Sequence, residues 1–213
     1  MNTTSASVLL CLLVGIWRSP AAEAPSMHTV QAYIDRCITH YVRGDILDAV
    51  SELKKALRLR PEDPHLHFMM ANALYRSKDM AGAANSYAAA LRLRPTHFEA
   101  RISHGFALFE TGEFKDAAAE WLSAIRLNPN EPFARAALAV GLYSIREIED
   151  AKVQYAVAVA MDKRYGNLSA LRVDIRWSLK AHGTLNRIDK LLRREGSPED
   201  LGRSIILSTG IGR

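Results

Sequence analysis

The sequence predicts an all-α protein, namely a solenoid of about four repeated helix pairs followed by a carboxyl-terminal capping helix pair. The hexapeptide ALRLRP occurs at residues 56–61 and again at 90–95, and the near copy AIRLNP occurs at 124–129. The three prolines therefore recur every 34 residues, a spacing in the range of helical repeats. Small and large apolar residues also alternate within each period at the spacing of an α-helix. These observations indicate one helix pair per period.

Residues 1–24 are expected to form a secretory signal peptide or a retained apolar arm. The run at residues 8–17 is continuously apolar, and the small residues Ala22 and Ala24 follow it in a suitable cleavage zone. No Lys or Arg precedes the run and Arg18 follows it, which departs from the usual signal. The run is too short for a transmembrane span, which needs about 20 apolar residues. The expected location is periplasmic or secreted if the signal is cleaved, and cytoplasmic or membrane-associated otherwise.

Four units are predicted, near residues 30–63, 64–97, 98–131 and 132–165, when each proline is placed at position 32 of its unit. Positions 8, 20 and 27 are small in every unit, so that two helix backbones can approach closely there. They hold Cys37, Ala71, Gly105 and Ala139; Ala49, Ala83, Ala117 and Ala151; and Ala56, Ala90, Ala124 and Ala158. Positions 17 and 24 are large and apolar, and hold Ile46, Met80, Phe114 and Ile148; and Leu53, Tyr87, Trp121 and Tyr155. Each unit therefore reads as two antiparallel helices.

The boundaries of these helices have local causes. The tripeptides RGD and TGE place Gly44 and Gly112 between the two helices of a unit, where glycine can adopt a positive φ. The proline at position 32 ends the second helix, because it lacks an amide hydrogen and pushes the preceding residue out of helical geometry. Arginines in the last turn, such as Arg58 and Arg92, meet the negative end of the helix dipole.

These columns resemble the tetratricopeptide repeat (TPR), whose 34-residue unit has small residues at positions 8, 20 and 27, an aromatic residue at 24 and proline at 32. The unit FEARISHGFALFETGEFKDAAAEWLSAIRLNP, at residues 98–129, matches best. The resemblance covers Val30 to about Lys163. It departs from the family at Lys163, which replaces the fourth proline, and at position 4, which lacks the favoured tryptophan. Together with the export signal, the resemblance implies a bacterial, exported member of this family.

The segment after the repeats is expected to end the solenoid. Residues 168–195 are predicted to form a helix pair without the alanine columns, and such a pair would cover the last apolar face of a solenoid that spans residues 27–195. Residues 196–213 contain proline and glycine but no period. They are therefore predicted to be a mobile tail.

The resemblance implies that positions 2, 5, 9, 12 and 13 of the first helix in each unit face a concave groove. Large apolar and aromatic side chains dominate these positions, so the expected ligand is an amphipathic helix or an extended apolar segment of a partner protein. The predicted partner-binding residues are Ile34, Ile38, Tyr41, Phe68, Asn72, Tyr75, Ile102, Phe106, Phe109, Val140 and Tyr143. Some family members grip a carboxyl-terminal carboxylate with Lys and Asn, but Ile34 and Ile38 occupy the matching places here. The alternative is that the rings at position 12 belong to the core.

Catalysis is not expected. The sequence has no phosphate-binding loop, nucleophile elbow, zinc-protease helix or paired-cysteine motif, and its seven histidines are scattered. Cys37 lies in a small-residue column and is expected to be a compact core side chain. We therefore predict no enzyme activity, and no catalytic, cofactor-binding or metal-binding residues.

Charge gives a weak indication of partners. The formal net charge is +5 and the pI is about 9.3, but acids and bases are interspersed, so nucleic acid is not favoured. The leading hypothesis is a scaffold or adaptor that holds a partner protein, of unknown identity, during assembly of a cell-envelope complex. The alternative is a self-assembling structural protein whose groove makes homo-oligomer contacts. A carrier of an apolar small molecule is a third hypothesis.

Overall fold

The computed structural model describes residues 27–168 and 178–211. The predicted signal segment, residues 1–24, lies outside the described residues, and so does most of the first half of the predicted capping pair. Within the described ranges, the helices are too short or too polar to cross a membrane.

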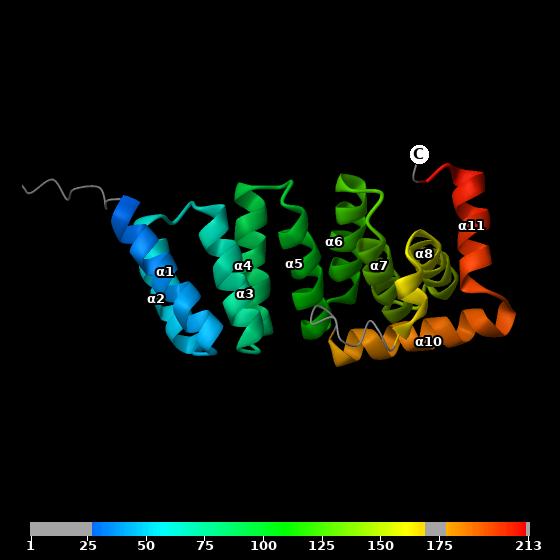
Figure 1. Cartoon of the computed structure of the whole chain (residues 1–213), viewed down its shortest axis with the longest axis horizontal. Helices are drawn as coiled ribbons and strands as arrows, with labels where there is room; N and C mark the ends of the chain where they lie inside the picture. Colours follow the sequence, from blue (N-terminus) through cyan, green and yellow to red (C-terminus); the bar gives the residue numbers. More distant parts are fainter. Residues whose placement is uncertain (1–26, 169–177, 212–213) are drawn as a thin grey trace, which may run out of the picture.

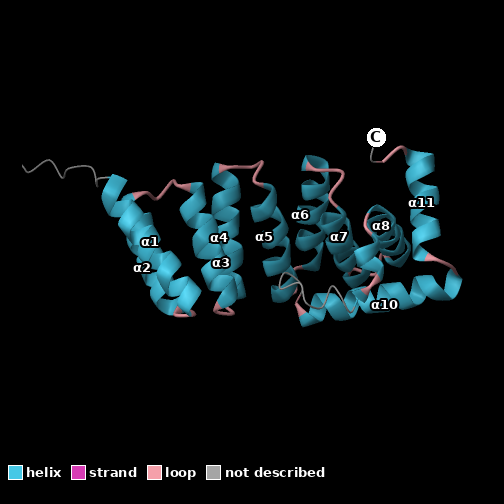
Figure 2. Ribbon diagram, viewed as in Figure 1, coloured by secondary structure: helices cyan, strands magenta, loops and turns pink. Residues whose placement is uncertain are grey.

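Consecutive antiparallel helix pairs follow the predicted units and stack side by side into an elongated, all-helical array (Figures 1 and 2). The all-α solenoid prediction is thus confirmed. The pairs are α1 (Met27–Arg43) with α2 (Ile46–Leu59), α3 (Pro64–Arg76) with α4 (Met80–Leu93), α5 (Phe98–Thr111) with α6 (Phe114–Leu127), and α7 (Pro132–Ser144) with α8 (Ile148–Met161). A short 3-10 helix, η1 (Lys163–Gly166), follows, and then α10 (Leu179–Glu195) and α11 (Pro198–Thr209).

Small residues occur where the helices touch. The alanines at position 20 are fully buried, and the large side chains at position 24 lie in the same core, Trp121 among them. Trp121 shows why position 8 is small. Its indole Nε1 donates a hydrogen bond of 3.1 Å to the Ile102 carbonyl oxygen, and a Cβ added to Gly105 would lie 2.4 Å from that nitrogen. Cys37, at the same position of the first unit, is also buried, and burial followed by the charge of Glu52 raises its pKa to about 11.

The turn inside each helix pair has a left-handed residue at position 15. Gly44 and Gly112 take this conformation with φ of 90° and 94°, as expected. The second and fourth units place Lys78 and Arg146 there, with φ of 71° and 73°. A side chain in this region costs about 1 kcal/mol or more relative to glycine, so these two units have basic residues at a mildly strained position.

The second half of the predicted capping pair, at residues 179–195, forms α10. α10 packs against α7 and α8 and runs across them rather than alongside them (Figure 1). Its apolar face, with Leu185 and Ile188, is fully buried. Polar contacts join it to α8: the Tyr155 hydroxyl donates to Asp189 at 3.0 Å, and Lys152 lies 2.6 Å from a Glu195 carboxylate oxygen.

The expectation of a mobile tail is wrong for residues 198–209, because they form α11 and pack along α8. The helix has ordinary end signals: Ser197 accepts a hydrogen bond from the Asp200 amide at 3.4 Å, Pro198 occupies the first turn, and Gly210 ends it with φ of 70°. A Cβ on Gly202 would lie 2.0 Å from the Ala156 carbonyl oxygen, so the two backbones meet there. α11 therefore covers the last face of the solenoid.

Candidate functional site

One candidate site is a cavity of about 590 Å³ between the first helices of the first three units. α1, α3 and α5 supply most of its walls, and α4 and the turn before it supply the rest. It is lined by Tyr41, Asn72, Tyr75, Arg76, Lys78, Tyr87, Ile102, Ser103 and Phe106. Tyr41, Asn72, Tyr75, Ile102 and Phe106 were predicted from the sequence as groove residues, and the structure brings these five together. We call this site the first cavity.

Two predicted groove residues are corrected to core positions. Phe109 is 1% exposed and packs against the rings of Phe114 and Trp121. At this position-12 residue the ring therefore belongs to the core, which was the alternative to a groove position. Val140 is 0% exposed, because α7 is enclosed by its neighbours and by α10. Val140 therefore cannot contact a partner in this conformation. Lys180 of α10 covers Phe109 further, with its Nζ 4.7 Å from the ring centroid and 2.8 Å from the Phe109 carbonyl oxygen.

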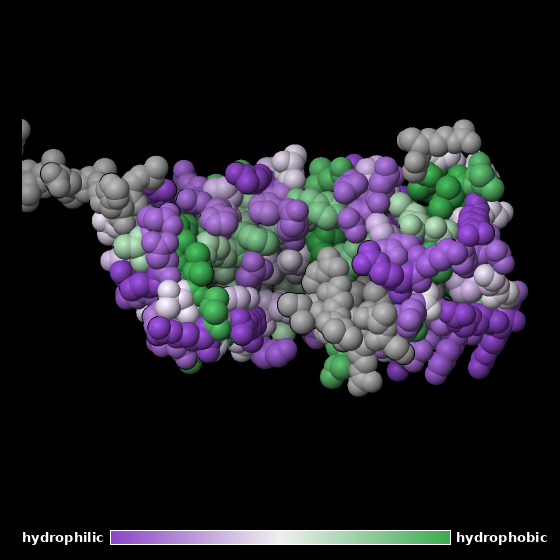
Figure 3. Space-filling model, viewed as in Figure 1, coloured by the Kyte–Doolittle hydropathy of each residue, from purple (hydrophilic) through white to green (hydrophobic). Residues whose placement is uncertain are grey.

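The remaining predicted residues do not line the first cavity. Ile34 is half-buried against the core of the first unit, and Ile38 is 49% exposed beside it. Phe68 is half-buried, with its ring centroid 4.7 Å from that of His97. Tyr143 is half-buried and lines a separate cavity. In the face shown in Figure 3, hydrophobic side chains form a narrow band near the amino-terminal end of the solenoid, among hydrophilic neighbours.

A polar chain crosses the wall of the first cavity. The Tyr87 hydroxyl donates to Asn72 Oδ1 at 2.6 Å, and Ser103 is hydrogen-bonded to Tyr87 in turn. Burial raises the pKa of Tyr87, and burial followed by the charge of Glu110 raises the pKa of Tyr75 to about 12. Both phenols are therefore neutral at physiological pH. Because the Asn72 oxygen accepts from Tyr87, the Asn72 amide nitrogen is the group that can donate to a ligand.

Two cations at the rim of the first cavity were missed as site residues. Arg76 Nη1 donates to the Tyr41 carbonyl oxygen at 2.9 Å, and its guanidinium carbon lies 4.5 Å from the Tyr41 ring centroid. Lys78 extends from the left-handed position of the turn. The sequence contained a usable signal for Lys78, since it replaces a glycine of the turn. It contained a signal for Arg76 as well, since Arg76 lies at position 13, one of the positions that the resemblance places on the groove.

A second cavity, of about 440 Å³, lies where α10 meets the ends of α5, α6 and α7. It is lined by Phe109, Phe114, Tyr143, Ser144, Arg146, Leu179, Lys180, Gly183, Thr184 and Arg187. Like the first, it combines aromatic rings with basic side chains. The sequence could not predict it, because it depends on the position of α10.

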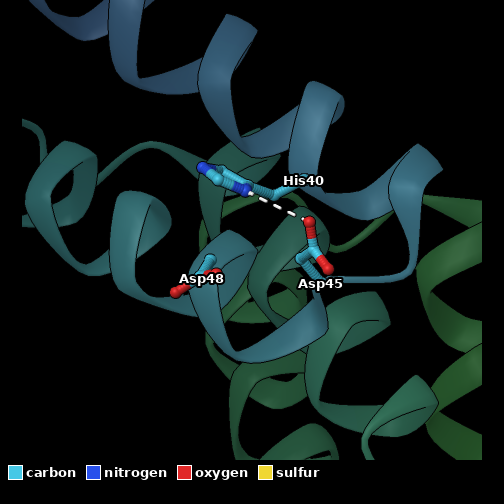
Figure 4. Close-up of side chains that lie close together, drawn as sticks. All are labelled: His40, Asp45 and Asp48. Carbon is cyan, nitrogen blue, oxygen red and sulfur yellow. Dashed lines mark ion pairs between the residues drawn. The ribbon is translucent and has the colours of Figure 1, made fainter.

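One group of metal-ligand types occurs in the described part of the chain. Potential ligand atoms of His40, Asp45 and Asp48 lie within 4.8 Å of one another, and His40 Nδ1 is 3.9 Å from an Asp45 oxygen (Figure 4). Asp45 directly precedes α2 and Asp48 lies in its first turn. The positive end of the helix dipole favours acids at both places, which explains the group without a metal.

Comparison with known proteins identifies the repeats. The family model described as "Tetratricopeptide repeat" matches residues 38–98 and 68–132. Residues 38–132 of the chain are therefore tetratricopeptide repeats. No curated protein matches this TPR protein in sequence.

Solved structures of low identity share the fold of this TPR protein. MamA (residues 41 to the end) from Desulfovibrio magneticus RS-1 is 22% identical, with a TM-score of 0.62 over 79% of this chain and 98% of that chain. Another MamA crystal structure is 18% identical, with a TM-score of 0.65 over 88% of this chain and 99% of that one. The first TPR of Spaghetti (RPAP3), bound to the HSP90 peptide SRMEEVD, is 19% identical, with a TM-score of 0.55 over 58% and 98%.

Proposed function

We propose that this TPR protein is a non-enzymatic scaffold that binds a segment of a partner protein in the first cavity. The observation that carries the proposal is the cavity itself, which has the volume of a ligand site, about 300 to 1,000 Å³, and is built from three successive repeats. Phe106 and Ile102 provide apolar surface, and Asn72 and the neutral tyrosines provide hydrogen-bonding groups. This combination suits a peptide, which presents both apolar side chains and backbone amides.

The open part of the groove is short. α10 covers α7, so the binding surface lies over α1, α3 and α5 and ends near Phe109. A helix of many turns along the whole solenoid is therefore not the expected ligand. We infer a short or extended segment that enters from the amino-terminal end. The TPR of Spaghetti (RPAP3), whose fold is similar, is bound to a peptide of this kind of length.

A cell-envelope role is part of the proposal and rests on the sequence. The apolar run at residues 8–17 supports export, and a periplasmic or secreted scaffold would serve assembly of an envelope complex. The cavity contributes no acid, base and nucleophile in a catalytic arrangement among its described lining residues, which favours binding over catalysis.

Photo-crosslinking in the source cell tests this function. A photoreactive phenylalanine derivative replaces Tyr75, which is half-buried at the cavity wall, and the control places it at Leu122, which is 46% exposed on α6. We expect position 75, and not position 122, to yield an adduct with a different protein, identified by mass spectrometry. Adducts with only the same chain would instead support the homo-oligomer alternative. Equal adducts from both positions, or none from position 75, would contradict the proposed site.

A further inference from the structure

We propose that the segment bound by this groove is acidic, an inference that rests on the proposed function and specifies the partner's chemistry. Both cavities have aromatic or apolar walls and basic rims, and neither is lined by a carboxylate among the described residues. The basic side chains are Arg76, Lys78, Arg146, Lys180 and Arg187. Five cations around two cavities favour an occupant that carries several carboxylates between apolar side chains.

The backbone gives an independent reason to consider Lys78 and Arg146 functional. All four units place a left-handed residue at position 15, and glycine adopts this conformation most easily. Two units have glycine there, whereas the other two have a basic residue that lines a cavity. Residues kept in a strained conformation concentrate at functional sites. The two turns that carry a cation at position 15 are thus the two turns whose position-15 residue lines a cavity.

Arg76 is held ready to bind a carboxylate. Its Nη1 bonds to the Tyr41 carbonyl oxygen and its guanidinium stacks on the Tyr41 ring, which fixes the plane of the group. The opposite edge of the guanidinium, with Nε and Nη2, then has a defined direction. A planar guanidinium binds a carboxylate through two parallel hydrogen bonds, so little side-chain freedom is lost when an Asp or Glu of the partner arrives.

The two cavities are close enough for one segment. α5 supplies Phe106 to the first and Phe109 to the second, and residues three apart on a helix are about one turn, or roughly 5 Å, apart. The segment would follow the edge of the groove where the helix-pair turns lie. Acids of these turns directly precede the second helices and line neither cavity; they are Asp45, Asp79, Glu113 and Glu147.

The test uses the full chain, fluorescently labelled, on an array of short random-sequence peptides. Its double variant Lys78→Gly/Arg146→Gly removes two rim cations and also relieves the left-handed strain, so the variant should fold at least as well as the wild type. The control Arg92→Gln/Arg94→Gln removes the same charge at the other end of α4, away from both cavities. We expect wild type and control to select peptides rich in Asp, Glu and apolar residues, and the double variant to bind them about tenfold more weakly.

Other outcomes separate this inference from the proposed function. Selection of apolar peptides without acids, unchanged in the double variant, would overturn the acidic partner and leave a peptide-binding groove. Binding that does not depend on the first cavity, shown by equal signals for wild type and Tyr75→Glu, would overturn the groove as well. Tighter binding of a single-stranded oligonucleotide than of any peptide, lost in the double variant, would assign the cations to nucleic acid and overturn the inference.

Discussion

At the scale of single residues, the packing of Gly105 against Trp121 leaves no room for one additional carbon atom. The indole occupies the space that a Cβ at position 105 would need, and its nitrogen is bonded to the preceding turn of α5. The other units have alanine or Cys37 at position 8, and Leu53, Tyr87 or Tyr155 at position 24. Each small residue of such a column is therefore matched to its own large neighbour, and each pair tolerates a different increase in side-chain size.

We expect Gly105→Ala to lower the free energy of unfolding by about 1 to 3 kcal/mol, because the indole must move to admit a methyl group. The matched change Gly183→Ala, within α10, meets nothing within 4 Å. It should be neutral or stabilise by about 0.5 to 1 kcal/mol, since alanine favours the helix. Urea denaturation of both variants decides the point, and equal stabilities would contradict the close packing of α5 on α6.

Glu52 makes stability depend on pH. Hydrogen bonds from Lys55 and then Arg36, whose Nε lies 2.7 Å from a carboxylate oxygen, lower the pKa of Glu52 from 4.5, although burial opposes them. A lowered pKa in the folded state stabilises the fold above the unfolded pKa, and this contribution disappears as the pH falls through the folded pKa.

Glu52→Gln should therefore cost about 1 kcal/mol at pH 7 and progressively less as the pH falls below about 4. Thermal melts over this range provide the measurement, with the exposed Glu62→Gln as control. A cost that does not change with pH would mean that packing, and not ionisation, explains the role of Glu52.

At the scale of elements, α11 gives the clearest example of a helix with local signals but no repeat period. Ser197, Pro198 and Gly210 specify where it begins and ends, by the same rules that shape the repeat helices. Gly202 allows α11 to pack on α8, because the backbone of α11 at Gly202 contacts the backbone of α8 at Ala156. This helix takes the position that the first helix of another unit would occupy.

Gly202→Leu is expected to separate α11 from α8, because the added side chain would overlap the α8 backbone. The expected loss is about 1 to 3 kcal/mol, together with faster proteolysis near residue 196. Ser204→Leu introduces the same side chain at an exposed site of α11 and serves as control. If both variants resist proteolysis as the wild type does, α11 does not form the cap in solution.

At the scale of the whole molecule, the two carboxyl-terminal helices have different roles. α11 closes the end of the array, whereas α10 crosses α7 and α8 and removes the fourth unit from the groove. In a solenoid, each unit contacts only its neighbours, so loss of an end cap is felt most strongly nearby.

Deletion of residues 197–213 should consequently accelerate amide hydrogen exchange most in α8 and α7 and least in α1 and α2. Hydrogen exchange with mass spectrometry measures this gradient. Uniform acceleration over the whole chain would show instead that the units unfold as one cooperative body.

The sequence by itself determined the number, order and ends of the repeat helices. These depend on local properties, namely the 34-residue period, the alanine columns, the turn glycines and the prolines, and these signals recur from unit to unit along the chain. It also indicated Tyr41, Asn72, Tyr75, Ile102 and Phe106 as groove residues, because their positions recur with the period.

Only the tertiary structure decided which part of the groove is open. α10 belongs to no repeat, so its amphipathic pattern shows that one face is buried but not which helices cover it. Contacts between residues as distant as Lys180 and Phe109 made Phe109 and Val140 part of the core, and they created the second cavity. The physical reason is that a repeated sequence encodes its own neighbours, whereas the docking of an aperiodic helix depends on complementarity across the folded molecule.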